Sequence, residues 1–562
     1  MTEVPLAHII APSGAVQGAE DLYSRGGALE RLPAEIKAGE DLDLGAHFNM
    51  LPAGIYRELA GMEDLFLELD FEGDLKVAVK HLSLSGDQTE ETFNARSGEK
   101  VRILADGDLI AVSLSSTGGA VLRSVTFIGG FPGTRPVRLA HIVCTYRREG
   151  DVKAKHELIM RFLRDNPEMG PSYRLIIVDS GRTLSAEDLA GAELMPSPNY
   201  GGSAGFARGI LRALEDPDVS DILLNDDDAV LEPEMIFRTI ALRSILLPEY
   251  ADTAVGGTML LRDRPLTVHE SGAEIRGSSV HALKRGTDLG TEEGCLGICR
   301  REPIDYFGWW YADFPRSAFE RFGLPLPFFF KMDDAEFGTR LAGMPRTTVP
   351  GISVWHPSFA AGISSRSVYY LSRNSMAAAA CRGCLNIADV HAWYVSVLTE
   401  TACIRYELAE AALRAAEDFL RGPDELFGMF MKGPKDLPDL PWSGPESLRD
   451  GLDIRTYKQR PRWFRFISMN GLLLPSDGDR EASPSERRTA LFYRAGRVLY
   501  IRDPEHAAVC VRDRHRTTSI IRKAKRLKRR MMSSRREMND NYSAAFSKYS
   551  SAEWWKSVFS EK

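Results

Sequence analysis

Apolar and polar positions alternate along the first part of the chain, and this period of two predicts short β-strands. Between Met62 and Lys80 the apolar positions are Leu65, Leu67, Leu69 and Phe71, then Leu75, Val77 and Val79. The turn Glu72-Gly73-Asp74 separates the two groups, which predicts a β-hairpin. Further short apolar runs follow as far as Ile128. Many short strands at this spacing are typical of a β-sandwich or jelly roll, which we expect over residues 1–135.

The pattern changes after the proline-containing stretch 131–136, where apolar residues begin to form continuous runs. These runs cover residues 139–144, 173–179 and 221–225, and stretches with helical spacing separate them. Continuous apolar runs are typical of strands buried on both faces, and their alternation with helices predicts a doubly wound α/β domain. Such domains bind ligands at the carboxyl ends of their strands. We expect this domain to occupy residues 136–375.

The remaining residues, 376–562, are predicted to be mainly helical, with a proline-rich irregular stretch after about residue 420. Residues 511–540 hold twelve Lys or Arg against three Asp or Glu, although the whole chain has a net charge of −7. The predicted helix places apolar residues on one face, namely Ile520, Ala524, Leu527 and Met531. A basic amphipathic helix of this kind suits the surface of an anionic membrane. Packing on an acidic partner subunit is the alternative, and no recognised module favours nucleic acid.

Cysteine usage and the distribution of apolar residues bear on location. Seven scattered cysteines favour free thiols in a reducing compartment, and we interpret the lone pair Cys381 and Cys384 as packing residues. The first residues lack the pattern of a signal peptide, and no run approaches the ~18–20 apolar residues that span a bilayer. We therefore expect a cytoplasmic protein that lies peripherally on the inner face of the cell membrane. The sequence leaves a homo-oligomer open.

Three adjacent carboxylates, Asp226, Asp227 and Asp228, directly follow the apolar run 221–225. Carboxylates so close together repel one another unless a positive group lies among them. Two of them, one residue apart, can bind one hard cation that bridges the phosphates of a nucleotide. A solvated acidic turn is the bland alternative, but the position at the end of a buried strand favours the metal. His356 follows a predicted short strand over residues 348–354, and it is a candidate third ligand because imidazole completes a site with two carboxylates.

A second acidic group, Asp333 and Asp334, follows the aromatic run Phe328-Phe-Phe330. An apolar environment raises the pKa of a carboxylate and makes it a better proton acceptor. Asp333 is also expected to cap the helix that follows. The pair Trp309 and Trp310 suggests a sugar site, because sugars stack their C–H faces on indole rings, although a buried core patch is equally compatible.

Two loops are candidates for nucleotide binding. The stretch 199–209, from Asn199, is rich in glycine and leads into a helix, as in a phosphate cradle. It matches neither the P-loop nor the dinucleotide fingerprint, which argues against an ordinary dehydrogenase. The loop after the first central strand contains Tyr146, whose ring can face a base, and Arg148, whose guanidinium can face phosphates.

Together these residues resemble the bacterial galactofuranosyltransferases of glycosyltransferase family 2, which polymerise cell-wall galactan from UDP-galactofuranose. The motifs that carry the resemblance are His47-Phe-Asn-Met-Leu-Pro-Ala-Gly-Ile-Tyr56, residues 199–209, Asp226-Asp-Asp228, Trp309-Trp310, Asp333-Asp-Ala-Glu-Phe337 and Trp355-His356. Their order and spacing, over most of the chain, make the match specific. One departure is Cys144-Thr-Tyr-Arg-Arg148, which stands where the family usually has Thr-Phe-Asn-Arg.

The resemblance implies a central domain of GT-A type and an inverting, metal-dependent transfer of galactofuranose to a lipid-linked glycan acceptor. It implies Mn²⁺ or Mg²⁺ on Asp226, Asp228 and His356, with Asp334 as the catalytic base. It also implies donor binding by Tyr146, Arg148, Asn199 and Asp227, and acceptor binding by Trp309, Trp310 and Asp333. A family 2 enzyme with another donor, such as a galactopyranose or rhamnose nucleotide, is one alternative. A non-catalytic glycan-binding scaffold is the other, and a nuclease or phosphatase is weaker because it gives the tryptophan pair no role.

Overall fold

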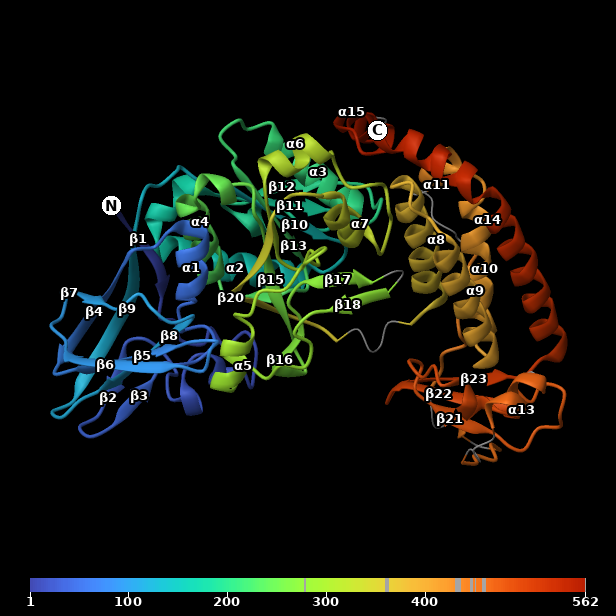
Figure 1. The fold of residues 1–562 in the computed structure, drawn as a ribbon, viewed down its shortest axis with the longest axis horizontal. Helices are drawn as coiled ribbons and strands as arrows, with labels where there is room; N and C mark the ends of the chain where they lie inside the picture. Colours follow the sequence, from blue (N-terminus) through green and yellow to red (C-terminus); the bar gives the residue numbers. More distant parts are fainter. Residues whose placement is uncertain are drawn as a thin grey trace.

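The structure is a computed structural model. It describes residues 1–276, 279–358, 363–429, 436–444, 448–449, 451–456, 461–468 and 470–560. Mixed sheets and helices make it a multidomain α/β protein, in which the chain runs from amino-terminal sheets through a large central sheet to a group of helices (Figure 1).

Two antiparallel sheets form the amino-terminal part. One has the strand order β1-β9-β4-β7 with β2 beside β9, and the other has the order β3-β8-β5-β6. The bounds are β1 (Thr2–His8), β2 (Ala34–Ile36), β3 (Asp41–Asp43), α1 (Ala53–Ala60), β4 (Asp64–Gly73), β5 (Lys76–Leu82), β6 (Gln88–Asn94), β7 (Lys100–Ile103), β8 (Leu109–Ser115) and β9 (Ala120–Phe131). Alternate residues, among them Leu67 of β4 and Val77 of β5, are buried in one shared core.

The predicted hairpin between Met62 and Lys80 is wrong, because β4 and β5 belong to different sheets. The chain crosses between the sheets at Gly73, whose φ of 94° favours glycine. The carboxylate of Asp74 then accepts hydrogen bonds from the backbone N–H groups of Thr117 and Gly118, at 2.9 and 2.8 Å. The acidic turn is therefore tied to the loop before β9 and does not close a hairpin.

Nine of the described strands of the central part form one mixed sheet with the order β12-β11-β10-β13-β19-β15-β20-β14, and β16 pairs with β15. The bounds are β10 (Leu139–Thr145), β11 (Tyr173–Asp179), β12 (Glu193–Pro196), β13 (Asp221–Asp226), β14 (Val230–Leu231), β15 (Ala254–Leu261), β16 (Arg264–Glu270), β19 (Ala312–Pro315) and β20 (Arg346–His356). β10, β11 and β13 confirm the three predicted strands, and they run parallel. The antiparallel strand β19 separates them from the parallel pair β15 and β20. β20 contains the predicted short strand 348–354, whereas β15 and β19 were not predicted.

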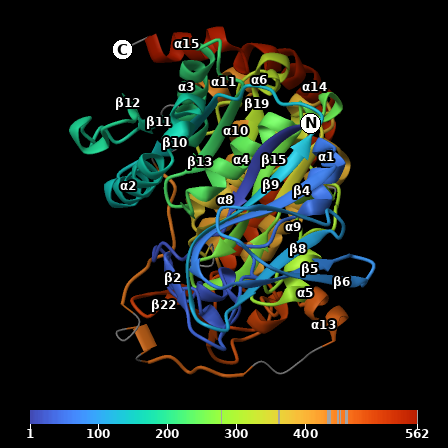
Figure 2. The ribbon, with the colours of Figure 1, turned by 90° about the vertical axis from the view of Figure 1, so that its left-hand side faces the viewer.

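Helices cover both faces of the parallel strands. Ile142 of β10 lies in one core with Phe206 of α3, whereas Val143 lies in another with Val152 of α2. The helices are α2 (Glu149–Asp165), α3 (Gly202–Leu214), α4 (Glu234–Ile245), α5 (Glu292–Gly297), α6 (Arg316–Phe322) and α7 (Asp333–Arg340), and the small hairpin is β17 (Ala273–Arg276) with β18 (Ser279–Ala282). α4 also contacts β1 and α1, so it joins the central sheet to the amino-terminal part (Figure 2).

The carboxy-terminal part contains the predicted helices and a small sheet that was not predicted. The helices are α8 (Ser365–Cys381), α9 (Ile387–Ala402), α10 (Tyr406–Phe419), α11 (Pro423–Gly428), α13 (Arg462–Ile467), α14 (Arg514–Tyr549) and α15 (Ala552–Ser560). The sheet is β21 (Arg480–Ala482), β22 (Arg497–Asp503) and β23 (His506–Val511). α14 runs along the outside of α8, α9 and α10, and α15 packs on α3 of the central part (Figure 1).

The basic helix α14 is amphipathic as predicted, but its apolar face is buried inside the protein. Ile520, Ala524, Leu527 and Met531 lie in the core that α14 shares with α8, α9 and α10. Arg516 and Lys523 pair with Glu407 and Glu417 of α10. The acidic partner of this helix is therefore, in part, a helix of the same chain. Among the described residues, no helix is long and apolar enough to cross a bilayer.

Candidate active site and metal centre

The three predicted metal ligands lie close together, at the carboxyl ends of two strands. Asp226 ends β13, Asp228 follows two residues later, and His356 ends β20. One ligand atom from each of the three lies within 4.8 Å of the others. His356 Nε2 lies 3.1 Å from Asp228 Oδ1, and the other ring nitrogen, Nδ1, lies 2.8 Å from the carbonyl oxygen of Pro357. Two carboxylates and one imidazole form a donor set that suits a divalent cation.

The three ligand candidates differ in their electrostatic environments. Burial and the neighbouring Asp228 raise the pKa of Asp226 to about 7. Burial alone would also raise the pKa of Asp228, but the contacts with His356 and Arg148 hold it below its usual value. Burial opposes protonation of His356, yet Asp228 and Asp226 raise its pKa overall. Such mutual repulsion among carboxylates favours a cation between them.

Arg148 and Tyr146 lie beside the carboxylates, in the loop after β10. Arg148 forms ion pairs with Asp228 and with Asp227, and its Nη1 lies 3.6 Å from Asp227 Oδ1. Tyr146 is 45% exposed, and the guanidinium of Arg147 lies over its ring. A guanidinium and a partly exposed aromatic ring are thus available next to the candidate metal site.

Two further residues beneath the carboxylates were not singled out in the sequence. Lys155 of α2 donates hydrogen bonds to Asn225 Oδ1, at 2.5 Å, and to the carbonyl oxygen of Asp226. Burial lowers the pKa of Lys155 to about 8, although the nearby carboxylates oppose this shift. Asn225 also donates to the carbonyl oxygen of Trp310. A lysine on the apolar side of an amphipathic helix was the signal that could have identified Lys155.

The glycine-rich stretch at 199–209 forms the start of α3. Asn199 Oδ1 accepts a hydrogen bond from the backbone N–H of Gly201, at 3.1 Å. Gly201 has a φ of 87°, and a side chain at this position would collide with the carbonyl oxygen of Phe329. Gly202 donates its backbone N–H to that oxygen, at 3.1 Å. The start of α3 is therefore packed against the segment that leads to the second acidic pair.

Asp333 and Asp334 begin α7, on the other side of the site. Burial, Asp334 and Asp226 raise the pKa of Asp333 to about 8, and burial raises the pKa of Asp334. The expected helix cap is wrong: Met332 occupies the capping position, in a left-handed conformation, and no side chain caps the helix. Asp333 lies one position inside the helix, where its carboxylate is still favoured by the helix dipole.

The source of the apolar environment also differs from the expectation. Phe328 is buried in the carboxy-terminal core, and Phe329 stacks on Tyr370 of α8 with 5.6 Å between ring centroids. Phe329 therefore packs on α8, whereas the ring of Phe328 lies near that of Phe427 in α11. Asp334 instead influences two residues that the sequence analysis did not select, Glu270 and Tyr306: burial and Asp334 raise the pKa of Glu270 to about 8, and burial and Asp334 raise that of Tyr306. Glu270 ends β16 in an irregular pattern that gave no sequence signal.

Trp309 and Trp310 do not present the open stacking surface that their pairing suggested. They are 3% and 7% exposed, respectively. Trp309 packs edge-on against Phe206 of α3, whereas Trp310 lies in the other core, 6.4 Å from the ring of His356 between centroids. The close packing of the two indoles covers their faces. Contact with an acceptor through these rings remains a prediction.

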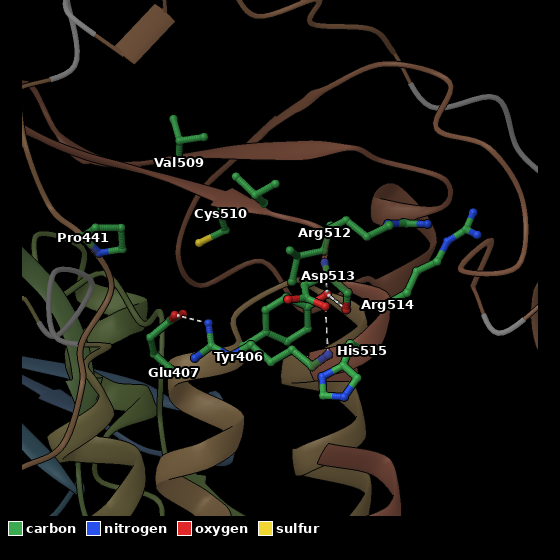
Figure 3. A pocket seen from close by; sticks show the side chains of 12 residues that line it. Tyr406, Glu407, Pro441, Val509, Cys510, Arg512, Asp513, Arg514 and His515 are labelled. Carbon is green, nitrogen blue, oxygen red and sulfur yellow. Dashed lines mark hydrogen bonds and ion pairs between the residues drawn. The ribbon is translucent and has the colours of Figure 1, made fainter. Parts of the chain in front are cut away.

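Two cavities differ in their relation to this site. One, of about 440 Å³, is lined by Asp227, Lys155 and Arg262, together with residues of the amino-terminal part near Val16. The other, of about 570 Å³, lies at the start of α14 and is lined by residues such as Tyr406, Glu407, Arg512 and His515 (Figure 3). Glu407 pairs with Arg516 there. The first cavity adjoins the carboxylates, and the second belongs to the carboxy-terminal part.

Comparison with known proteins supplies relatives, although no family model matches the chain. The galactofuranosyltransferase GlfT2 of Mycobacterium tuberculosis is 28% identical over 452 residues, 72% of this chain and 69% of the relative. The protein of the same name from Mycolicibacterium smegmatis is 25% identical over 446 residues, 72% of this chain and 68% of the relative. The solved structure of S. aureus TarS 1-349 is 10% identical and covers 52% of this chain and 89% of that one, with a TM-score of 0.29. The two relatives confirm the resemblance to galactofuranosyltransferases noted in the sequence, and they support the enzyme class, a glycosyltransferase.

Proposed function

We propose that this glycosyltransferase moves galactofuranose from UDP-galactofuranose to a glycan acceptor, by an inverting and metal-dependent reaction. The observation that carries the proposal is the proximity of two groups at one edge of the central sheet: the cluster of Asp226, Asp228 and His356, and the acidic pair at the start of α7. Asp226 raises the pKa of Asp333, so the two groups share one electrostatic environment. The two galactofuranosyltransferase relatives supply the donor.

Asp226, Asp228 and His356 are the residues that would hold Mn²⁺ or Mg²⁺. When bound, a divalent cation would neutralise negative charge on the diphosphate of the donor. We assign the central region, residues 136–375, as a catalytic domain of GT-A type, between a β-sandwich over residues 1–135 and a helical region over residues 376–562.

The side chains of this chain have separate tasks in the reaction. Asp334 accepts the proton of the acceptor hydroxyl as that oxygen bonds to the anomeric carbon, on the face opposite the departing UDP. The bond between the anomeric carbon and the phosphate oxygen breaks, and UDP leaves with the electron pair. The raised pKa of Asp334 makes it a stronger proton acceptor than an exposed carboxylate.

Donor and acceptor are bound by the groups around the two acidic clusters. Tyr146 stacks on the base, Arg148 binds a phosphate, and Asn199 and Asp227 complete the donor side. Asp333 accepts a hydrogen bond from the acceptor when it is ionised. Trp309 and Trp310 support the acceptor side.

The acceptor is proposed to be lipid-linked, so a membrane contact is part of the proposal. The apolar face of α14 is buried, which leaves its outer, basic face to meet an anionic membrane. The exposed cations there are Arg522, Lys525, Arg526, Arg529 and Arg530. Trp463 and Ile467 of α13 and the nearby Leu473 are 64%, 66% and 62% exposed. Arg514, at the start of α14, donates to the carbonyl oxygen of Leu474 at 3.1 Å, so the residue after Leu473 contacts the first turn of α14.

Flotation with vesicles of phosphatidylcholine, with and without phosphatidylglycerol, tests this contact. We expect binding only to the anionic vesicles, and loss of binding when Trp463, Ile467 and Leu473 are all replaced by Ser. The control is Leu104→Ser, which changes an exposed leucine of the amino-terminal part. Absence of binding to either vesicle, or equal binding by the triple variant, contradicts the membrane proposal.

Release of the nucleoside diphosphate from each donor in a panel of nucleotide sugars, with Mn²⁺, Mg²⁺ or EDTA and a short galactofuranose acceptor, tests the main proposal. We expect metal-dependent turnover of UDP-galactofuranose. Turnover of a galactopyranose or rhamnose nucleotide alone would replace the donor and keep the enzyme class. Absence of turnover of every donor in the panel, with a folded protein, would favour a non-catalytic glycan-binding scaffold.

A further inference from the structure

The segment that leads into α7 has an unusual backbone. Lys331 and Met332 have φ values of 66° and 73°, so two consecutive residues with side chains adopt the left-handed region. L-residues other than Gly, Asn and Asp rarely adopt this conformation, and it persists where surrounding contacts impose it. Asp333 and Asp334 follow directly. Whatever imposes this turn therefore also determines where the two carboxylates point.

Asn374, in the middle of α8, contacts this turn. Its side-chain nitrogen Nδ2 donates hydrogen bonds to the carbonyl oxygens of Phe330, at 3.0 Å, and Lys331, at 2.9 Å. The side chain is fully buried. One amide thus binds both carbonyl groups that flank the start of the left-handed pair.

Asn374 is itself held in place by its neighbour on α8. Arg373 Nε donates to Asn374 Oδ1 at 2.9 Å, which fixes the orientation of the amide. Arg373 is fully buried and lies over the ring of Tyr370, 5.0 Å from its centroid. Tyr370 stacks on Phe329, so the same helix contacts the segment at a second point. Side chains of α8 therefore contact three consecutive residues of the segment before α7, namely Phe329, Phe330 and Lys331.

We propose that Asn374 is a positioning residue that sets the turn at Lys331 and Met332 and thereby aims the carboxylates of Asp333 and Asp334 into the active site. The role of the carboxylates rests on the proposed function, whereas the control of the turn by Asn374 does not depend on it. The carboxy-terminal helical part then has a direct share in the active site, through a residue that does not touch substrate.

An amide is suited to this task because it offers two N–H donors on one nitrogen and carries no charge at any pH. Aspartate would present only acceptors to the two carbonyl oxygens, and alanine would remove both donors from them. Serine retains a single donor. The three substitutions therefore remove the hydrogen bonds to different extents.

The first test measures kcat and KM for the donor in Asn374→Ala, Asn374→Asp and Asn374→Ser. Misplacement of a reacting group by about 1 Å lowers rates by roughly 100-fold, so we expect kcat to fall by about 10- to 100-fold in the Ala and Asp variants. Serine should lose less. KM for the nucleotide sugar should change less than kcat, because Asn374 itself contacts no donor-binding residue. A wild-type kcat in the Ala variant would overturn the proposal.

The second test is a rescue, which a purely structural role for Asn374 would not give. Glycine adopts positive φ without cost, so Lys331→Gly together with Met332→Gly makes the turn accessible without the amide. Combined with Asn374→Ala, the glycine pair should recover most of the lost kcat. Failure to recover any activity, in a variant that unfolds at the wild-type temperature, would contradict the proposal.

The matched control is Asn539→Ala. Asn539 of α14 also bridges backbone groups, since its side chain accepts from the N–H of Leu385 at 3.1 Å and donates to the carbonyl oxygen of Leu385 at 3.2 Å, but it lies away from the turn. We expect it to leave kcat unchanged, and an equal fall in kcat would overturn the specific role of Asn374.

Hydrogen exchange of the peptide that spans residues 327–336 separates this inference from the proposed function. Asn374→Ala should speed exchange there and leave α14 as protected as in the wild type. Faster exchange together with an inactive wild-type protein would retain the positioning role and remove the transferase proposal. An active wild type with unchanged exchange in the variant would retain the transferase proposal and remove the positioning role.

Discussion

The imidazole Nε2 of His356 lies 3.1 Å from the carboxylate Oδ1 of Asp228, and this contact joins the end of β20 to the turn after β13. Both atoms are candidate metal ligands. A proton on Nε2 and a divalent cation therefore compete for the same place. The pKa of His356 is raised overall by Asp228 and Asp226, against the effect of burial, so the proton is held more tightly than on a free imidazole.

Metal binding should accordingly stabilise the protein more at higher pH. A cation that binds only the native state at 100 times its Kd adds about 2.7 kcal/mol, which corresponds to a rise in Tm of a few degrees. We expect Mn²⁺ to raise the Tm at pH 8 and to have little effect at pH 5, where His356 is protonated. Asp228→Asn and His356→Ala should abolish the shift, and the exposed His515→Ala should retain it. An undiminished shift in both ligand variants would contradict the assignment.

Loss of the proton acceptor should stop transfer and leave donor binding intact. Asparagine at position 334 keeps the shape of the side chain and removes its basicity, so Asp334→Asn should lower kcat by at least about 100-fold. Titration calorimetry with UDP and metal should give the wild-type affinity. Asp263→Asn, an exposed aspartate in the turn before β16, is the control. Turnover of Asp334→Asn near the wild-type rate would remove Asp334 from this role.

The elements that the sequence predicted are those with a strong local signal. The continuous apolar runs of β10, β11 and β13 identify buried strands without any tertiary information. Asp226 and Asp228 could be selected because a cluster of carboxylates at the end of such a strand is costly without a cation. His356 could be selected because it too follows the end of an apolar strand.

The remainder depended on contacts between distant segments. Glu270 lies at an unremarkable place in the sequence, and only the fold brings it close enough to Asp334 for their charges to interact. Trp309 and Trp310 could be sugar platforms or core residues by sequence, and their burial was decided by α3 and by the packing around β15. The hairpin failed because turn chemistry alone does not specify which sheet the second strand joins.

Glu270 should make stability depend on pH. Its pKa is raised to about 8 from an ordinary value of 4.5, first by burial and then by Asp334. Between these values the unfolded chain has released the proton and the native state has kept it, so the stability falls as pH rises from about 4.5 to about 8. Glu270→Gln removes this contribution. The Tm of the variant relative to the wild type should be higher at pH 8 than at pH 5, by an amount equivalent to about 1–3 kcal/mol.

The control for Glu270→Gln is Glu249→Gln, which changes an exposed glutamate and is measured across the same pH range. Its Tm relative to the wild type should not change between pH 5 and pH 8. If the two variants show the same dependence, the slope does not come from the buried carboxyl of Glu270.

A buried charge cluster at the other end of β13 should govern the stability of the central sheet. Arg243 of α4 is fully buried, and its Nε lies 3.0 Å from Asp221 Oδ1 and also pairs with Asp313. Burial raises the pKa of Asp313 to about 7, and Arg243 opposes this shift. Arg243→Ala leaves the buried carboxylate of Asp313 without its paired cation and leaves Asp221 with Arg135 alone, at 3.4 Å. This loss should cost about 3–5 kcal/mol and lower the Tm accordingly. Neutralising both acids, as in Arg243→Ala with Asp221→Asn and Asp313→Asn, should recover part of that loss, because the repulsion between the carboxylates is removed.

The control is Arg164→Ala, on the exposed side of α2, which should leave the Tm unchanged. A loss in the triple variant as large as in Arg243→Ala would show that packing of the arginine side chain, and not its charge, stabilises the sheet.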